Sequence, residues 1–491
     1  MASTQGFDET HPAAPTPTGG ARPPAVIQGG MGVGVSSWRL ARAVATTGQL
    51  GVVSGVALDA VLARRLQHGD PGGDVRRALA HFPVAEVAER ILRRYFVPGG
   101  IAPGQRFRPA PRLGVRPNID STELMLAGNF VEVYLARQGH DGPIGINYLE
   151  KIQLATPAAV YGAMLAGVDY VLMGAGIPTE IPGLLDSFAS GGPGELTVTV
   201  AGAVAGERHT VRLDPATLFG GAPPAVVRPQ FLAIVSSAVL AAYLVRNRAS
   251  TPDGFVLETA IAGGHSAPPR GPLRLDAGNE PVYGPRDEID VTKVAALGLP
   301  FWLAGGHAST GGLARAKAVG AAGIQVGTAF ALCRESGIEP DLRRRLLEEA
   351  LAGTLVVRNE PHASPTGFPF KVAQLSGTVA DGEVYAARPR LCDLGYLRVP
   401  YRRANGGVGY RCPAEPVATY LRKGGSVEDT HGRRCLCNGL IATIGLAQNH
   451  DGDVEPALVT LGQNLDFLPG LVAVAGTDFG ASDVVAHLLR S

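Results

Sequence analysis

The tetrapeptide Ala-Gly-Gly-His occurs twice in this chain, at residues 262–265 and at residues 304–307. Each copy contains a glycine pair, which permits positive φ angles and lets a ligand approach the backbone without meeting a Cβ atom. The two copies differ in the residues on their C-terminal side. A stiff loop with two prolines comes after His265, whereas a glycine-rich turn that opens a helix comes after His307. These contexts predict that the first loop holds His265 over a pocket, and that His307 is a bystander or a secondary contact to a ligand.

The next apolar run ends in another small-residue pair, Gly327-Thr328, which precedes a further helical segment. Adjacent loops of this type after the last two strands of a barrel bring N–H groups and helix N-termini together, and many barrels bind phosphate there. We therefore interpret Gly305, Gly306, Gly327 and Thr328 as a phosphate site. The competing interpretation is that these residues only shape turns.

Four of the five cysteines fall in one late segment, at Cys392, Cys412, Cys435 and Cys437. Four soft ligands in a cysteine-poor chain are typical of a tetrathiolate site for zinc or for an iron–sulfur cluster. The spacing lacks the paired C-x₂₋₄-C knuckles of structural zinc sites, and buried cysteines also serve as small hydrophobic residues. The sequence leaves the presence of a metal open.

Eight short apolar runs ending in Gly, Ser, Asn or a similar small residue alternate with helical patterns, which is typical of βα units. Eight parallel strands with intervening helices predict a closed (β/α)₈ barrel, an α/β fold whose chemistry lies on the loops after the strand ends. An open, doubly wound sheet is the alternative architecture. The runs begin at Ala25, Gly51, Pro143, Tyr170, Phe231, Gly254, Pro300 and Gly323.

Several segments exceed a minimal barrel, which we expect to span residues 23–337. Residues 1–22 are rich in proline and polar residues and predict a disordered tail. A helical insertion is expected at about 57–116 and a β-hairpin insertion at about 182–228, where it could fold over the barrel mouth. Residues 338–491 are expected to form an extension packed on the barrel.

The second barrel helix is expected to begin near Asp120. Asp120 and Glu123 stand three residues apart, which is the spacing of a capping box.

Composition narrows the possible partners. Lys plus Arg number 44 and Asp plus Glu number 43, and no basic run interleaved with aromatic residues occurs, so we expect no nucleic acid partner. The chain start lacks the pattern of a signal peptide, and its longest apolar run is too short to span a membrane. Five cysteines suit a reducing compartment. We therefore expect a cytoplasmic protein that binds a small molecule; the sequence does not predict its oligomeric state.

Motifs at the barrel loops resemble one enzyme family. "IQGGM" lies at the end of the first run, "GINYL" at the third and "AGGH" after the sixth, and "LAGG" and "IQVGT" end the last two. Together they resemble the nitronate monooxygenase (2-nitropropane dioxygenase) family, whose flavin-dependent barrels are similar to FMN-dependent enoyl-ACP reductases. The resemblance covers residues 25–335, and later segments such as "YRCPAEPV" and "GRRCLCNGL" resemble a longer bacterial subgroup.

The resemblance implies FMN as cofactor and assigns roles to particular residues. His265 would be the catalytic acid or base. The cofactor contacts would come from residues along the isoalloxazine ring, a hydrogen-bonding amide, the phosphate loops and a nearby glutamine: Gly29, Gly30, Met31, Asn147, Gly305, Gly306, Gln325, Gly327 and Thr328. Two positions depart from the family pattern, because Ile261 replaces an acidic residue and Ser266 a basic one. Arg270 is a candidate for the missing positive charge.

Three reactions remain open at this stage. In the favoured one, an alkyl nitronate is oxidised with O₂ to a carbonyl compound and nitrite. In the second, NAD(P)H reduces FMN, which passes hydride to an enoyl thioester, free or on a carrier protein, while protonated His265 supplies the proton. The third is a non-redox phosphate-binding barrel, an isomerase or lyase, for which Lys151 is the candidate lysine near a strand end.

Overall fold

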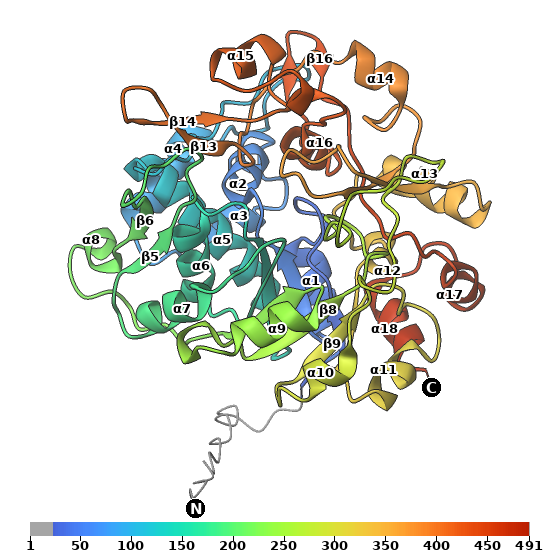
Figure 1. Cartoon of the computed structure of the whole chain (residues 1–491). Helices are drawn as coiled ribbons and strands as arrows, with labels where there is room; N and C mark the ends of the chain where they lie inside the picture. The colour runs from blue at the N-terminus through green and yellow to red at the C-terminus, as the bar shows by residue number, and fades with distance from the viewer. Residues whose placement is uncertain (1–22, 491) are drawn as a thin grey trace, which may run out of the picture.

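Eight parallel strands form the centre of the computed structural model, which describes residues 23–490 (Figure 1). Their order around the sheet is β1-β10-β9-β8-β7-β4-β3-β2. The sheet closes on itself because Gln28 N donates to Leu50 O (2.9 Å) and Leu50 N donates to Val26 O (3.1 Å), which joins β1 to the start of β2. A closed barrel is therefore confirmed and the open sheet is excluded. The strands are β1 (Val26–Gln28), β2 (Gly51–Ser54), β3 (Ile144–Leu149), β4 (Tyr170–Gly174), β7 (Gln230–Val235), β8 (Gly254–Glu258), β9 (Phe301–Ala304) and β10 (Gly323–Val326).

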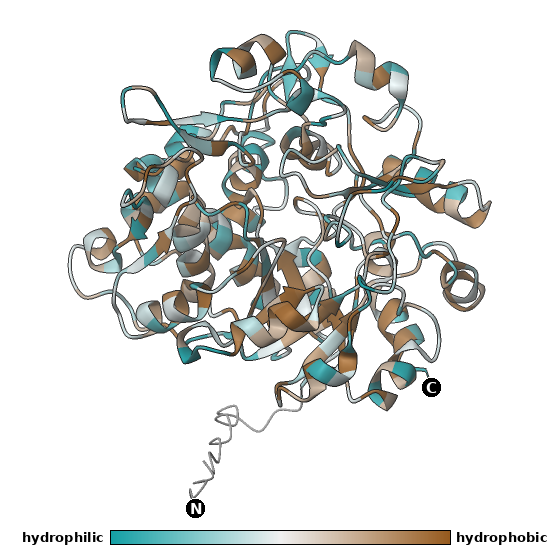
Figure 2. Ribbon diagram, viewed as in Figure 1, coloured by the Kyte–Doolittle hydropathy of each residue, from teal (hydrophilic) through white to brown (hydrophobic). Residues whose placement is uncertain are grey.

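All eight strands coincide with the apolar runs expected from the sequence. Their residues are buried almost throughout, because helices cover the outside of a barrel and side chains fill its inside. In Figure 2 the strands at the centre of the molecule are correspondingly brown.

A ring of helices surrounds the barrel. Seven of them each come after a strand: α1 (Trp38–Ala45), α5 (Ile119–Arg137), α6 (Thr156–Leu165), α7 (Ile181–Ala189), α9 (Ala238–Leu244), α10 (Val291–Ala295) and α11 (Gly312–Ala318). The helix after β10, α12 (Thr328–Ala331), is a single turn. The eighth place is taken by the C-terminal helix α18 (Ala481–Leu489), which packs against α1, α11 and α12 (Figure 1).

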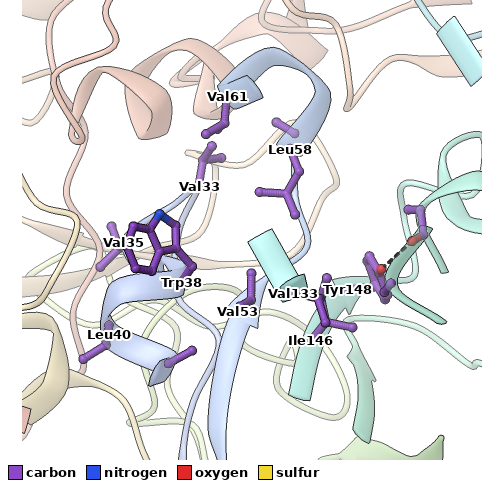
Figure 3. Close-up of a cluster of buried hydrophobic side chains, with 14 of the residues drawn as sticks. Val33, Val35, Trp38, Leu40, Val53, Leu58, Val61, Val133, Ile146 and Tyr148 are labelled. Atoms are coloured by element: carbon purple, nitrogen blue, oxygen red, sulfur yellow. Dashed lines mark hydrogen bonds between the residues drawn. The ribbon is translucent and has the colours of Figure 1, made fainter. Parts of the chain in front are cut away.

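Apolar side chains join the ring to the barrel. Figure 3 shows Trp38 and Leu40 of α1 together with Val53 of β2, and Val133 of α5 beside Ile146 of β3. Each of these side chains is less than 10% exposed. Burying one such side chain stabilises the folded state by about 1.5–3 kcal/mol. The cluster therefore fixes the first two βα units relative to each other.

The second barrel helix, α5, begins at Ile119, near Asp120 as expected, but its cap differs from the expected one. Its N-cap is Asn118, whose side chain accepts a hydrogen bond from Ser121 N (2.8 Å). Glu123 does not complete a capping box; its carboxylate pairs with Arg90 instead. Asn118 thus satisfies one first-turn donor, Ser121 N, and Asp120 lies inside the helix.

The insertion between β2 and α5 is helical, as the sequence predicts. It contains α2 (Leu58–Gln67), α3 (Asp74–Leu79) and α4 (Ala85–Tyr95). The second insertion forms the expected hairpin, β5 (Gly194–Thr197) paired with β6 (Thr210–Leu213), and α8 (Pro215–Phe219) comes next. This hairpin packs against α6 and α7 on the side of the barrel rather than over its mouth.

The segment after β10 runs across the carboxyl ends of the barrel strands before it reaches α18. It contains three two-stranded antiparallel sheets, and in Figure 1 its orange and red elements arch around the barrel. The strands are β11 (Val357–Glu360), β12 (Phe370–Ala373), β13 (Val399–Arg402), β14 (Val408–Arg411), β15 (Asn449–His450) and β16 (Asp453–Val454). The helices before α18 are α13 (Pro340–Leu351), α14 (Gly382–Ala387), α15 (Val417–Arg422), α16 (Leu436–Ala442) and α17 (Leu468–Ala475).

Two remaining expectations concern the chain ends and membranes. The tail expected at residues 1–22 lies outside the described residues. Within residues 23–490, no helix has both the length and the apolar character needed to cross a membrane.

Candidate active site

Two adjoining cavities lie at the carboxyl ends of the barrel strands. The first is bounded by the loops after β1, β8, β9 and β10 and by residues 460–467 of the extension. The second is bounded by the ends of β2, β3, β4 and β8 and by other parts of the extension. The cavities meet at residues that line both: Gly30, Gly32, Glu258, Gly263, Gly264 and Thr460.

The glycine pair after β9 lines the first cavity. Gly305 and Gly306 both have positive φ, at 89° and 78°. A Cβ on Gly305 would lie 2.2 Å from Thr259 Oγ1, and one on Gly306 would lie 2.8 Å from Ile261 Cδ1. Only glycine therefore fits at both positions, and the backbone is left bare toward the cavity.

The loop after β10 reaches the same cavity through Gly327 and Thr328, and Gly327 is the N-cap of α12. The Thr328 hydroxyl accepts a hydrogen bond from Gly462 N of the extension (2.8 Å). Because its oxygen already serves as an acceptor there, its hydrogen is free to be donated elsewhere. The structure thus brings all four residues of the expected phosphate site to one cavity.

The loop after β1 lies against the end of β3. A Cβ on Gly30 would come within 2.3 Å of the Asn147 Cβ, so the two loops meet only because residue 30 has no side chain. Ser36 Oγ holds this loop by donating to Gly29 O (3.0 Å) and accepting from Met31 N (2.9 Å). Gly29, Gly30 and Met31 therefore line the first cavity in a fixed conformation.

Two amide side chains at the cavities have buried oxygens without a hydrogen-bond partner in the described chain. They are Oδ1 of Asn147, which lines the second cavity, and Oε1 of Gln325, which lines the first. Buried polar atoms are nearly always paired, so these two acceptors fit a ligand that donates hydrogen bonds from both sides of the junction. The two amide oxygens suit a planar polar ring, and the exposed backbone near Gly306 and Gly327 suits a phosphate attached to that ring.

His265 lines the second cavity, where the extension holds it in place. Its Nε2 lies 2.8 Å from Ser364 Oγ, and its ring packs edge-on against Phe370 with centroids 4.8 Å apart. Burial among these groups lowers the pKa of His265 to about 4. The imidazole is therefore mostly neutral near pH 7. The expected role of protonated His265 in enoyl reduction stays a prediction, and this lowered pKa disfavours it near neutral pH.

Glu258, the last residue of β8, was missed in the sequence. It is half-buried and lines both cavities at their junction. Burial raises the pKa of its carboxyl group to about 7, and the charge of Lys371 partly opposes this rise. A carboxyl group that titrates near neutral pH is suited to general acid and base chemistry. The sequence signal for it was an acidic residue that ends an otherwise apolar strand.

Lys371 comes from β12 of the extension, and its side chain is fully buried behind the loop after β8. Its Nζ donates to Ala260 O (2.5 Å) and Ser266 Oγ (2.8 Å). Burial lowers the pKa of Lys371 to about 8. A positive charge therefore lies beside Ser266, at the position that departs from the family pattern, but it comes from a distant part of the chain.

Other expected residues lie elsewhere. Arg270 is exposed, and its guanidinium donates to the carbonyl oxygens of Arg286 and Ser236, so it is not the missing positive charge. Lys151 pairs with Glu150 (3.2 Å) and lines neither cavity, which removes the candidate lysine of the non-redox alternative. His307 lines the first cavity beside Gly306, away from His265.

Part of the chain is similar to a known family. Residues 227–363, which contain β7 to β11, match the family described as nitronate monooxygenase. A nitronate monooxygenase of Paraburkholderia phytofirmans is 36% identical over 104 residues, covering 21% of this chain and 26% of that protein. A (3aS,4S,5R,7aS)-5-hydroxy-7a-methyl-1-oxo-octahydro-1H-indene-4-carboxyl-CoA dehydrogenase of Mycobacterium tuberculosis is 34% identical over 113 residues, covering 22% and 28%. The chain thus spans about a quarter of the length of these curated relatives.

Among solved structures, FabK from Thermotoga maritima aligns with 95% of this chain and 91% of its own. The TM-score is 0.45 and the sequence identity is 16%.

Proposed function

We propose that this protein is an FMN-dependent oxidoreductase. Residues 227–363 match the nitronate monooxygenase family. The first cavity, which the glycine loops line, adjoins the second cavity, which His265 lines. The observation that carries the proposal is the junction of the two cavities at Glu258, Gly263 and Gly264. A ligand with its phosphate at the glycine loops would extend from there toward His265.

The described residues fit FMN by type and position. The backbone at Gly305 and Gly306, the start of α12 at Gly327 and the Thr328 hydroxyl would hold the phosphate. The unpaired oxygens of Asn147 and Gln325 would accept hydrogen bonds from the ring. Bound FMN would supply two-electron transfer.

We propose an alkyl nitronate as the first substrate candidate, oxidised with O₂ to a carbonyl compound and nitrite. Neutral His265 would accept a proton from the α-carbon if the neutral nitroalkane entered instead. Phe370 and the extension would shield that proton transfer from water.

A second candidate is reduction of an enoyl thioester with NAD(P)H as reductant. Two observations favour it. The second cavity is lined largely by apolar side chains, which suits an acyl chain: Val33, Val56, Leu149, Ile152, Ile234, Leu397, Leu436 and Leu440. In addition, Glu258, with its pKa raised to about 7, would be partly protonated near pH 7 and could supply the proton to the α-carbon.

Anaerobic rapid mixing of the FMN-loaded protein separates the two candidates. If nitronates are substrates, propionate 3-nitronate or an alkyl nitronate bleaches the flavin absorbance and O₂ restores it with release of nitrite. If enoyl thioesters are substrates, NADH or NADPH bleaches the flavin and the enoyl thioester restores it. Protein that is colourless and takes up no FMN would contradict both candidates.

The cofactor site itself is tested by glycine replacement. Gly306→Val should abolish FMN binding, because the branched side chain meets Ile261 and blocks the bare backbone. Gly183→Ala is the matched control, since a Cβ there meets nothing within 4 Å. Flavin content after purification is the measurement, and full retention in Gly306→Val would show that the phosphate binds elsewhere.

A further inference from the structure

A short segment of the extension, residues 460–463, lies against the first cavity, and we call it the strap. It is an irregular stretch of chain between β16 and α17. Thr460, Leu461 and Gly462 line the first cavity, and Thr460 also lines the second. The residues expected to hold FMN all belong to the barrel, so the strap adds a wall to their site from a distant part of the chain.

Two hydrogen bonds attach the strap to the loop after β8. Gly264 N donates to Thr460 Oγ1 (2.8 Å), and Gln463 N donates to Ile261 O (3.1 Å). The first and the last residue of the strap are thus both bound to the loop that carries His265.

A third hydrogen bond attaches the middle of the strap to the loop after β10, because Gly462 N donates to Thr328 Oγ1 (2.8 Å). In the barrel, β9 lies between β8 and β10. A segment bound to the loops on both sides therefore bridges the carboxyl end of β9, where Gly305 and Gly306 line the cavity.

The backbone of the strap rests directly on the barrel loops. A Cβ on Gly263 would lie 2.9 Å from the carbonyl carbon of Leu461 and 3.0 Å from Gly462 N. A Cβ on Gly462 would lie 3.0 Å from Thr328 Oγ1 and 3.2 Å from Ile261 O. Both contacts are too close for a side chain, so a ligand has no room to pass between the strap and these loops.

The strap also offers a polar group to the ligand. Thr460 Oγ1 accepts a hydrogen bond from Gly264 N, so the hydrogen of this hydroxyl is free to be donated to a ligand. Thr328 on the opposite side of the cavity has the same arrangement with Gly462 N. The two hydroxyl groups suit a ligand that is rich in acceptor oxygens, such as a phosphate ester of a sugar alcohol.

The outer end of the strap has an anchor that lies outside the site. The side chain of Gln463 is exposed and lines neither cavity. Its Nε2 donates to Glu280 Oε2 (2.9 Å) and to Val357 O (3.3 Å). Glu280 Oε2 also accepts from Asn359 N (2.7 Å), which joins the anchor to β11. This anchor can be removed without removing a contact to the ligand.

We propose that the strap encloses bound FMN and must detach from the loops after β8 and β10 before FMN enters or leaves. This inference rests on the proposed function, because it takes FMN as the ligand of the first cavity. A ligand with its phosphate at the glycine loops would lie beneath the strap. Its other end would reach the second cavity, which Phe370 and Leu436 of the extension also line. Opening of such a segment can limit the rate of ligand exchange.

The test measures both rates of FMN exchange in the intact chain. Flavin fluorescence gives the association rate after FMN is mixed with protein freed of flavin, and the release rate after dilution of the loaded protein. Gln463→Ala should raise both rates by about 3- to 10-fold, since the strap loses its anchor, and should leave the Kd for FMN nearly unchanged. Gln105→Ala, at another exposed glutamine that lines neither cavity, is the control and should change neither rate.

A second variant tests the polar group of the strap. Thr460→Val removes both the acceptor for Gly264 N and the hydroxyl donor, so the release rate should rise more than the association rate. The Kd for FMN should therefore increase by about 3- to 10-fold. Thr460→Ser keeps the hydroxyl and should restore the native values.

Two results would overturn the strap while FMN binding by the native chain upholds the proposed cofactor. One is native exchange rates in Gln463→Ala. The other is faster release from that variant with an unchanged association rate, because the segment would then hold FMN without controlling its entry. Native protein that takes up no FMN would contradict the proposed function itself, and the strap with it. Circular dichroism checks that each variant is folded.

Discussion

At the scale of single residues, burial acts in opposite directions on the two titratable groups of the active-site cavity. It lowers the pKa of His265 to about 4, because the charged form of histidine is the protonated one. It raises the pKa of Glu258 to about 7, because the charged form of a carboxyl group is the deprotonated one. Near neutral pH, the histidine is therefore neutral and the carboxyl group is partly protonated.

Glu258→Gln should lower kcat/KM by about 10²- to 10⁴-fold, the usual contribution of a positioned general acid or base. It should also remove an inflection near pH 7 from the pH profile of kcat/KM. Steady-state kinetics from about pH 5 to about pH 9, with the substrate identified by rapid mixing, measures both effects. Glu348→Gln, at an exposed position of α13, is the control. An unchanged inflection in the Glu258 variant would exclude Glu258 as its source.

The histidines of the two Ala-Gly-Gly-His motifs should differ in their effect on turnover. His265→Ala should keep FMN and the fold but slow turnover of a neutral nitroalkane by about 10²- to 10⁴-fold, since that substrate requires proton removal. Turnover of a preformed nitronate should suffer less. His307→Ala should change the chemistry little, because His307 lies in the first cavity beside the phosphate loops. Equal, near-native rates in both variants would leave His265 without a catalytic role.

At the scale of elements, two connections from the extension define the site. The loop after β8 pairs with β12: Ser266 N donates to Pro369 O (2.9 Å) and Lys371 N donates to Gly264 O (2.9 Å). These bonds hold His265 between the barrel and Phe370. The second connection is α18, which completes the outer ring of helices against α1 and α11.

The contribution of α18 is measurable with two neighbouring leucines. Leu488 is fully buried, whereas Leu489 is 44% exposed. Leu488→Ala should lower the free energy of unfolding by about 2–5 kcal/mol, because it leaves a cavity between α18 and the ring. Leu489→Ala should change it by no more than about 0.5 kcal/mol. Urea unfolding followed by circular dichroism compares them, and similar midpoints would mean that α18 does not pack as described.

At the scale of the whole molecule, the barrel could be predicted from the sequence, whereas the contacts of the extension with the barrel could not. The eight strands were predictable because parallel strands buried on both faces are continuous apolar runs, such as those at Phe231 and Gly254. The glycine loops that line the first cavity were predictable because their small residues come directly after two such runs. The N-cap of α5 was not, since Asn118 and Asp120 are both competent caps.

The remaining errors arise from contacts between distant parts of the chain. Lys371 stands 105 residues from its partner Ser266, so no local pattern connects them, and a nearby arginine, Arg270, was the natural but wrong candidate. The four late cysteines line one small space of the extension through the same kind of contact. Glu258 could have been predicted from its place at a strand end, but its raised pKa depends on how deeply the extension buries it.

Replacing Lys371 tests whether the extension controls the chemistry of the barrel. Lys371→Met keeps the volume but removes the charge that favours ionised Glu258, so the pKa of Glu258 should rise. The inflection in the pH profile of kcat/KM should therefore move to higher pH. Lys293→Met, at an exposed lysine of α10, should leave the inflection unchanged. A shift to lower pH would contradict the assigned charge interaction.

The position of α18 also has a consequence for synthesis of the protein. The last strand of the barrel, β10, ends at Val326, whereas the helix that completes the ring begins at Ala481. At translation rates of about 5–20 residues per second, the ribosome adds that helix on the order of ten seconds after the last strand. During this interval the apolar faces of α1 and α11 have no cover. We therefore expect the barrel to reach its final packing only after α18 has emerged from the ribosome, and chaperones that bind apolar surface to act on this nascent form.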